Sequence, residues 1–428
     1  MKKKSLILDA KQFWISQTCL LQGTYWRRLL WGILLLPAML QGQVCQGVIY
    51  GKVILKNGET YQGQLRWGNE KALWDDIFSA SKNERPMRHL LSKEEDRRIK
   101  RRTEEFKYGF MALWEDKNPN LNFSFRCYYG DIRKLTVQGD NTVLLQLKNE
   151  KEISLRRNRG GDLDKKINVF DQQKGKVQFG FDRIHAIEFQ DTPSSFNCPL
   201  GTPVYGKVST TRGVFEGFIT WDREECLSKD KISGKQQGNN VDLKFGNIKT
   251  LKAQKNGSMI TMRSGRVLFL NDHDDVSSGN HGITVRGLYL GQVTVEWENF
   301  ISVTFLEPQL PPPAYDYFKT PEILAGTVLL NNGTRYRGQI IYDLDEIYNV
   351  EFLNGDNGKY QYFIPFSFIK RIEPQNDKFS TVYLKEESQL LLGGNSDVDS
   401  GNHGIIVIKP SGRAEYVEWK DIKSIDFD

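Results

Sequence analysis

The sequence predicts an all-β protein built from tandem copies of one repeat. Three observations predict it: apolar residues that alternate with period two, Asn-Gly dipeptides between apolar segments, and a threefold self-similarity along the chain. The 428 residues are 39% hydrophobic and 26% charged, which excludes wholesale disorder and a polytopic membrane protein. A prior of about 150 residues per domain gives roughly three domains, as the three copies do.

The first element is an apolar run at residues 29–40, preceded by two arginines and four upstream lysines. The run is too short for a bilayer-spanning helix, which needs about 20 apolar residues, and fits a signal-peptide core. We therefore expect residues 1–45 to be a signal peptide cleaved near residues 42–46, or an uncleaved signal anchor. Acylation of Cys45 is a further alternative, although the preceding residues match a lipoprotein signal poorly. The protein is expected to be exported, and thus periplasmic, secreted or envelope-associated.

Three copies of one unit follow the leader. They begin with GKVILKNGETYQGQLRW at Gly51, GKVSTTRGVFEGFITW at Gly206 and GTVLLNNGTRYRGQIIY at Gly326. Copies two and three also share DVSSGNHGI and DVDSGNHGI, from Asp275 and Asp397. The predicted organisation is repeat 1 at 46–189, a linker at 190–203, repeat 2 at 204–305, a Pro-rich linker at 306–323 and repeat 3 at 324–428.

Each copy divides again into two half-units of about 50 residues, which both end in an apolar strand, a short polar turn and another apolar strand. A glycine kept in mid-strand, at Gly63, Gly217 and Gly338, predicts a bend or bulge of the kind that lets a small barrel close. Short strands, a Gly bend and a last strand after a tight turn resemble the SH3-like small barrels, which include Sm-like and PRC-type barrels. The resemblance implies a fold of small barrels and no particular function.

Copy one carries about 39 more residues than copy two, which places a charged insertion at roughly 79–122. Ser92 and Glu95 form a capping-box signature, so a helix is expected from Lys93 to Lys107. Its basic residues are a candidate partner-binding arm, with the alternative of a solvated helix laced with salt bridges. The candidates are Arg97, Arg98, Arg101 and Arg102.

The net charge of +6 is distributed unevenly along the chain. Residues 1–45 hold six basic and one acidic side chains, and residues 82–107 hold ten basic and six acidic ones. The remaining residues, which include most of the repeated units, therefore carry a net charge of −3. This distribution argues against a nucleic-acid partner and leaves a protein or an envelope polymer as the expected partner. Contact with a membrane is expected only through an uncleaved or lipidated amino-terminal segment.

One loop could carry ion chemistry. In copy two it places Asp272, Asp274, Asp275 and Asn280 close to His281, and clustered oxygens are what Ca²⁺ requires. The favoured interpretation is a long hairpin loop whose Asp and Asn side chains bond to nearby backbone amides. Calcium binding is the alternative, and no other cofactor is expected.

The five cysteines are Cys19, Cys45, Cys127, Cys198 and Cys226, and none forms a C-x-x-C pair. A bridge between Cys198 and Cys226 would fit an oxidising compartment. Aromatic residues recur at equivalent strand positions, where we expect them to fill the cores, with stacking on sugars as the alternative. They are Trp67, Trp221, Trp297 and Trp419, with Phe181 and Tyr342 at related positions.

The chain contains no recognisable catalytic motif: it lacks H-E-x-x-H, a P-loop, a G-x-S-x-G elbow and a dinucleotide fingerprint. The leader and the repeats indicate an exported, non-enzymatic scaffold or interaction module of the cell envelope. A calcium- or carbohydrate-binding module using the loop from Asp272 to His281 is the second hypothesis. A hydrolase with sites between the barrels is the third. The PPxY sequence at 312–315 is expected to be part of a spacer.

Overall fold

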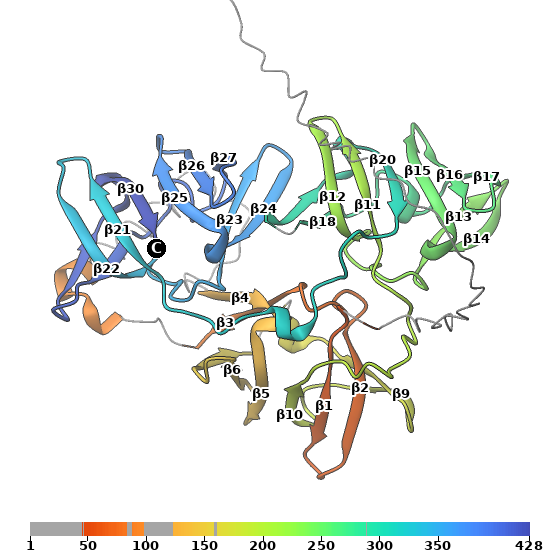
Figure 1. The fold of residues 1–428 in the computed structure, drawn as a ribbon, viewed down its shortest axis with the longest axis horizontal. Coiled ribbons are helices and arrows are strands. Elements are labelled where there is room, and N and C mark those ends of the chain that lie inside the picture. The colour runs from red at the N-terminus through yellow and green to blue at the C-terminus, as the bar shows by residue number, and fades with distance from the viewer. Residues whose placement is uncertain (1–44, 46, 84–87, 98–122, 158–160, 288) are drawn as a thin grey trace, which may run out of the picture. The chain divides into compact units, whose positions relative to one another are not determined.

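The computed structural model describes residues 45, 47–83, 88–97, 123–157, 161–287 and 289–428. All described strands and helical turns belong to one compact unit, residues 43–428. In its described residues each repeat has ten strands, and every pairing between them is antiparallel (Figure 1). The predicted all-β class is confirmed. None of the described helices is long and apolar enough to cross a bilayer.

The strands of copy one are β1 (Tyr50–Leu55), β2 (Thr60–Trp67), β3 (Ile77–Lys82), β4 (Ser124–Tyr128), β5 (Ile132–Gln138), β6 (Thr142–Leu147), β7 (Glu152–Arg156), β8 (Ile167–Asp171), β9 (Gly175–Phe179) and β10 (Ile184–Phe189). Those of copy two are β11 (Tyr205–Thr210), β12 (Gly213–Thr220), β13 (Lys231–Gln236), β14 (Asn239–Lys244), β15 (Ile248–Gln254), β16 (Gly257–Met262), β17 (Val267–Leu270), β18 (Ile283–Gly287), β19 (Gly291–Val295) and β20 (Phe300–Leu306). Those of copy three are β21 (Ala325–Leu330), β22 (Arg335–Ile341), β23 (Phe352–Asn357), β24 (Tyr360–Pro365), β25 (Ile369–Pro374), β26 (Phe379–Leu384), β27 (Gln389–Gly393), β28 (Ile405–Ile408), β29 (Ala414–Val417) and β30 (Ile422–Phe427).

Short 3-10 helices interrupt the strands at repeated positions. They are η1 (Arg88–Leu90), η2 (Tyr129–Asp131), η3 (Asp162–Asp164), η4 (Phe245–Asn247), η5 (Asp274–Val276), η6 (Trp297–Asn299), η7 (Tyr315–Tyr317), η8 (Phe366–Phe368) and η9 (Trp419–Asp421). Five of them, η2, η4, η6, η8 and η9, stand immediately before the strand that ends a half-unit, where the sequence predicted a tight turn.

The three copies share one strand order, which in copy one is β9-β8-β2-β1-β10-β5-β6-β7-β3-β4. Copy three repeats this order from β29 to β24. Copy two does so from β19 to β17, and its β13–β14 hairpin is attached by an isolated bridge between Lys235 and Asn271. The assigned sheets are open in the described residues, so their hydrogen-bonded ladders do not close into barrels.

The half-units exchange strands. In copy one, β1 and β2 of the first half pair with β10 and β8 of the second half. In the same way β6 and β7 of the second half pair with β5 and β3 of the first half. Copy one therefore contains two five-stranded halves of mixed origin, β9-β8-β2-β1-β10 and β4-β3-β7-β6-β5, joined where β10 pairs with β5. The internal duplication seen in the sequence is thus an intertwined pair, in which neither half completes a sheet alone.

The mid-strand glycines are explained by close approach of another strand. A Cβ at Gly63, Gly217 or Gly338 would lie 2.1, 2.0 or 2.1 Å from a carbonyl oxygen of the strand crossing it. Glycine alone avoids that clash. The predicted bulge lies elsewhere: the register shifts after Ile54, at Ser209/Thr210 and after Leu329, where the first strand pairs with the last. The expected Asn-Gly turns do connect hairpins, with Gly58 and Gly333 at φ of +88° and +85°.

The insertion of copy one occupies the turn between β3 and β4. Residues 83–123 separate these strands, whereas residues 237–238 separate β13 from β14, so the difference is the 39 residues expected. The backbone is helical at residues 93–97. The capping box is present, since the Ser92 N–H donates to Glu95 over 2.7 Å and the Glu95 N–H to Ser92 over 3.2 Å. The remainder of the predicted helix lies outside the described residues.

The Pro-rich linker between copies two and three runs along copy one. Lys148 donates to the carbonyls of Tyr315 and Phe318, and the Tyr315 hydroxyl donates to the carbonyl of Ile132 over 2.9 Å. The Tyr315 ring lies 4.6 Å from that of Trp74. The tyrosine of the PPxY sequence therefore packs against copy one of the same chain.

The bridge between Cys198 and Cys226, which the sequence left open as one possibility, is not formed. Cys198 is bonded to Cys45, at a sequence separation of 153, whereas Cys226 is a free, buried thiol. The bond joins the start of the described chain to the linker between copies one and two. Cys45 is buried there, at 1% exposure. A sequence pattern cannot identify such a pair because pairing depends on the distance between the Cα atoms, here 5.4 Å.

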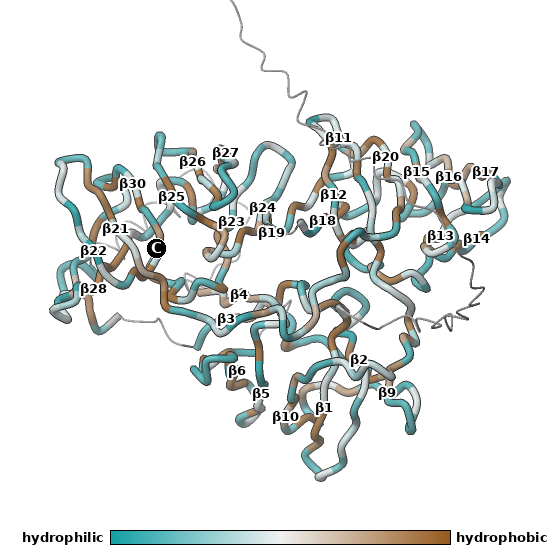
Figure 2. The backbone as a smooth tube through the Cα atoms, in the orientation of Figure 1, coloured by the Kyte–Doolittle hydropathy of each residue, from teal (hydrophilic) through white to brown (hydrophobic). Residues whose placement is uncertain are grey.

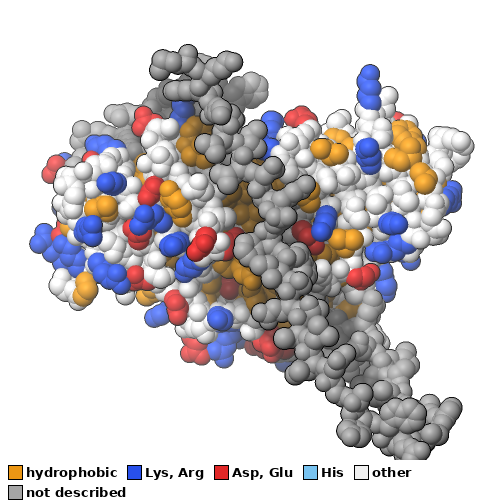
Figure 3. Space-filling view, turned by 45° about the horizontal axis from the view of Figure 1, so that its top comes forward, with side chains coloured by type: hydrophobic (Ala, Val, Ile, Leu, Met, Phe, Trp, Pro, Cys, Tyr) orange, Lys and Arg blue, Asp and Glu red, His pale blue; other side chains and the backbone are white. Residues whose placement is uncertain are grey.

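The cores follow the alternation of the strands, as the apolar positions of the tube in Figure 2 show. Copies two and three share one continuous cluster, because β19 pairs with β24 and extends one sheet through both. Copy one has its own cluster, to which Leu227, Phe318 and Tyr348 from elsewhere in the chain contribute. On the face in Figure 3, basic and acidic side chains are interspersed.

Candidate functional site

The acidic loop of copy two is held by its own chain. Asp275 accepts a hydrogen bond from the Ser233 N–H over 2.6 Å, and its carbonyl accepts one from the Trp221 indole over 2.9 Å. Asn280 accepts from the Gly282 N–H over 2.9 Å. Asp272 is exposed, at φ +53°, and lies 3.8 Å from Lys235, while Asp274 begins η5.

Copy three repeats these bonds. Asp397 accepts from the Asn354 N–H over 2.7 Å, its carbonyl accepts from the Tyr342 hydroxyl over 2.5 Å, and Asn402 accepts from the Gly404 N–H over 2.9 Å. The shared DVxSGNHGI sequence thus has a structural explanation, as the turn interpretation supposed. In the part of the chain that the structure describes, no three His, Cys, Asp or Glu side chains are arranged to hold a metal ion.

The histidines of the shared DVxSGNHGI sequence are hydrogen-bonded to aspartates of the same copy. The backbone N–H of His281 donates to Asp222 over 2.5 Å, and its Nδ1 lies 2.9 Å from the same oxygen. His403 makes the same two contacts with Asp343. Asp222 and Asp343 have φ of +48° and +46°, and Gly68 occupies the equivalent position of copy one at +53°.

The other predicted residues are not gathered into a site. Arg97 is exposed, and Arg98, Arg101 and Arg102 lie outside the described residues. Trp67, Trp221 and Trp419 are buried at 0%, 0% and 3% exposure, which agrees with the core interpretation, while Trp297 is half-buried.

A junction between the copies is the feature that the sequence analysis missed. The loop after the second strand ends in a carboxylate at equivalent positions, Asp76, Asp230 and Glu351. Each carboxylate accepts two backbone N–H bonds from its own loop, of 2.6 to 3.0 Å. Alignment of the three loops gives the only sequence signal for this position.

Each of these carboxylates also binds a cation from another copy. Asp76 of copy one lies 3.0 Å from Arg286 of copy two. Asp230 of copy two lies 2.7 Å from Arg66 of copy one. Glu351 of copy three lies 2.7 Å from Lys82 of copy one, which also contacts Asp345 at 2.8 Å.

These pairs are almost removed from solvent. The side chains of Lys82 and Glu351 are 6% and 2% exposed, and those of Arg286 and Asp76 are 3% and 4% exposed. Burial raises the pKa of Asp75 to about 6, although the adjacent Arg286 opposes that shift. The carboxylates around Lys82 outweigh its burial and raise its pKa. Charges buried this deeply depend on their partners, so the junction ties the three copies together.

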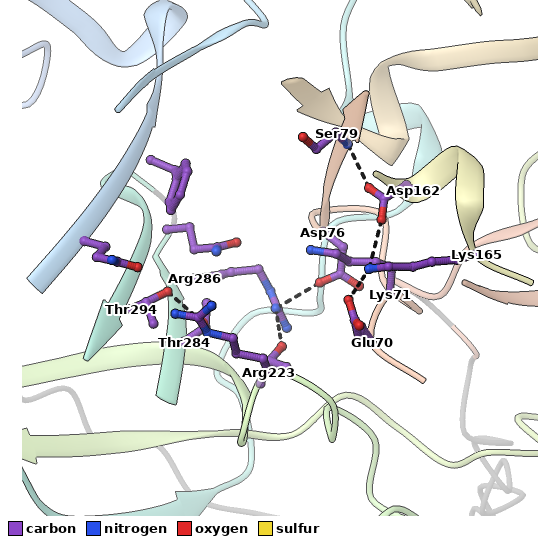
Figure 4. A pocket seen from close by; sticks show the side chains of 14 residues that line it. Glu70, Lys71, Asp76, Ser79, Asp162, Lys165, Arg223, Thr284, Arg286 and Thr294 are labelled. Atoms are coloured by element: carbon purple, nitrogen blue, oxygen red, sulfur yellow. Dashed lines mark hydrogen bonds and ion pairs between the residues drawn. The ribbon is translucent and has the colours of Figure 1, made fainter. Parts of the chain in front are cut away.

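A polar cavity of about 270 Å³ lies at this junction (Figure 4). Copy one contributes Glu70, Lys71, Asp76, Ser79, Asp162 and Lys165; copy two contributes Thr220, Arg223, Thr284, Arg286, Gln292 and Thr294; copy three contributes Gln361 and Phe363. The lining contains no cysteine or histidine, and its charged, hydroxyl and amide groups are suited to binding a polar molecule.

The comparisons with known proteins do not identify a family for the chain. No protein-family model matches it, and no curated protein sequence matches it. A streptogramin B lyase structure aligns with 70% of this chain and 94% of that one, at 10% identity and a TM-score of 0.10.

Proposed function

We propose that the protein is an exported, non-enzymatic scaffold of the cell envelope, whose tandem units are SH3-like small barrels and whose partner is a protein or an envelope polymer. The observation that carries the proposal is the junction, where buried carboxylates of all three copies bind cations from other copies. Three interlocked repeats present their loops and edges in a fixed arrangement, which suits a platform for binding.

The strand order supports the likeness to small barrels, although the assigned hydrogen-bonded ladders of the described residues are open. Each five-stranded half of copy one runs from the last strand through a first and second strand of one half-unit to a third and fourth strand of the other. The mid-strand glycine and the 3-10 turn before the last strand occur in each copy. These are the features on which the resemblance to SH3-like barrels rests.

The edges of the sheets support a binding role. Among the described residues β4, β9, β14 and β29 each pair on one side alone. The same strand position is paired on both sides at β19 and β24, where copies two and three meet. An edge strand of this kind can accept a further strand from a partner.

Export is supported by the disulfide. A bond between Cys45 and Cys198 persists in an oxidising compartment, and it requires that Cys45 stay in the mature chain with its sulfur unacylated. Cleavage before Cys45, within the expected window, satisfies both conditions.

Fractionation of native cells with determination of the amino-terminal residue tests export. An envelope or secreted fraction beginning at residues 42–45 is expected, and a cytoplasmic protein retaining residue 1 would overturn the export proposal. Crosslinking in an envelope extract, with wild-type protein and the junction variant Lys82→Met, tests the scaffold. A partner should be enriched by the wild type only, and no enrichment over a bead control would contradict the proposal.

A further inference from the structure

The cavity at the junction contains more cationic groups than its own carboxylates occupy. Its lining has four cations, Lys71, Lys165, Arg223 and Arg286, and three carboxylates, Glu70, Asp76 and Asp162. The carboxylates are already bonded within the chain, whereas two of the cations, Lys71 and Arg223, form no ion pair with a described residue.

All three carboxylates have their partners. Asp76 accepts two backbone N–H bonds and binds Arg286 at 3.0 Å. Asp162 accepts from the Ser79 N–H over 2.7 Å and lies 3.3 Å from Lys165, which also binds Glu70. Lys165 is thus shared by two carboxylates.

Two of the cations, Lys71 and Arg223, have no carboxylate partner. Neither Lys71 nor Arg223 has a carboxylate oxygen of a described residue within 4 Å of its charged nitrogens. Arg286 is paired through part of its guanidinium, since Nη1 binds Asp76 and Thr220 and Nε lies 3.3 Å from Asp75. Arg286 is 3% exposed, and its Nη2 is buried with no hydrogen-bond acceptor among the described residues. A buried guanidinium donor without an acceptor is costly, and an anion in the cavity would supply one.

The cationic groups of the cavity differ in position and in exposure to solvent. Figure 4 shows Arg286 and Arg223 of copy two on one side of the cavity and Lys71 of copy one on the other. Arg286 is buried and Arg223 is exposed, so positive charge extends from the interior to the surface. The hydroxyls of Thr284 and Thr294, 2.9 Å apart, lie beside them.

The charge at the Lys71 position is special to copy one. The equivalent residues of copies two and three are Glu225 and Glu346. Only copy one has a cation at this position. Lys71 lines the same cavity as Arg286 and Arg223 of copy two.

From these observations we infer that the cavity is a binding site for a small anion, whose carboxylate or phosphate group is held by Arg286, Arg223 and Lys71. Planar guanidinium groups suit both anions, since they donate two parallel hydrogen bonds. The threonine hydroxyls and glutamine amides suit a ligand with further hydroxyl groups. This inference does not depend on the scaffold role.

The test is calorimetric titration of the mature, disulfide-bonded protein with inorganic phosphate, citrate and glycerol. Saturable binding of phosphate or citrate is expected, and the stronger of the two identifies the anion class. Glycerol should not bind saturably. The variant Lys71→Gln/Arg223→Gln should lose at least about tenfold in affinity, equivalent to about 1.4 kcal/mol. The control Lys249→Gln removes an exposed charge on β15 and should bind as the wild type does.

The inference fails if neither anion binds saturably to the wild type, or if the double variant binds as tightly as the wild type. Thermal melting of the variants without ligand separates loss of the site from loss of the fold, because Lys71 and Arg223 form no ion pair with described residues. An unchanged melting temperature is expected for both variants.

Discussion

Copies two and three are joined differently from copies one and two. Copies two and three are joined by backbone hydrogen bonds: β19 pairs with β24 in register from Gln292–Phe363 to Val295–Tyr360. One hydrophobic core continues through both copies. Copies one and two are joined by side chains, through the ion pairs Arg66–Asp230 and Arg286–Asp76 and the disulfide at Cys198. One repeat therefore supports two modes of association.

The two modes depend on sequence in different ways. Backbone pairing at an edge is satisfied by many side chains, so the copies can diverge without losing it. A buried ion pair needs both partners, and removal of one leaves an uncompensated charge. The attachment of copy one should therefore be sensitive to single substitutions to a degree that the β19–β24 junction is not.

Loss of the buried cation at Lys82 should have the largest effect. Lys82→Met leaves Glu351 and Asp345 without their cation in the interior, and we expect the free energy of unfolding to fall by about 3 to 5 kcal/mol. Urea unfolding measures this loss. The control is Lys134→Met, whose ion pair with Glu188 is 35% exposed on both sides and should contribute at most about 1 kcal/mol. Equal effects at the two sites would contradict the distinction.

Removal of the disulfide should have the next largest effect. Cys198→Ser opens a link of sequence separation 153, and we expect a loss of about 2 to 4 kcal/mol in the free energy of unfolding. A reductant should produce the same loss in the wild type and none in the variant. Cys226→Ser is the control, because Cys226 is a free thiol and its variant should remain sensitive to the reductant.

The sequence predicted what depends on local pattern. Alternation and Asn-Gly dipeptides gave the strands and hairpins, and the offsets between copies gave an insertion whose length agrees with the β3–β4 turn. The exchange of strands between half-units was not predictable in this way. A strand such as β8 presents the same alternation whether it pairs with its own half-unit or with β2 of the other.

The junction between the copies was missed for a related reason. Arg66, Lys82 and Arg286 stand at positions where the other copies carry unrelated residues, so the repeat gives no reason to select them. The acidic loop was selected for its clustered oxygens, and those of Asp275 and Asp397 accept hydrogen bonds within their own copies. Repetition identified what each copy needs to fold, whereas the cations that join the copies stand at positions where the copies differ.

The loop of copies two and three can be compared directly with that of copy one. Asp222→Gly removes the bonds to His281 and keeps a residue that tolerates positive φ, as Gly68 does in copy one. We expect a loss of about 1 to 3 kcal/mol in the free energy of unfolding. Asp343→Gly should cost more, because His403 is 18% exposed and His281 is 68% exposed. Asp222→Asn keeps an acceptor and should lose less, and amide exchange at the two histidines checks the order.

The pH dependence of stability distinguishes the same loops by charge. Burial and the nearby Asp275 raise the pKa of Glu225 from its ordinary value of 4.5 to about 8, whereas copy one has Lys71 at this position. The folded state therefore holds a proton that the unfolded state has lost between about pH 4.5 and 8. The contribution of Glu225 to stability is complete below pH 4.5 and is lost as pH rises through 8.

Glu225→Gln should remove that dependence because the amide resembles the protonated acid. We expect the variant to match the wild type near pH 4.5 and to exceed it in the free energy of unfolding at pH 9. The wild-type slope should be steeper than the variant's by at most about 1.4 kcal/mol per pH unit. Urea unfolding across this range measures both slopes, with Glu298→Gln as an exposed control. Parallel slopes would show that the carboxyl at this position titrates in the folded and unfolded states alike, and that Lys71 changes only the charge of the cavity.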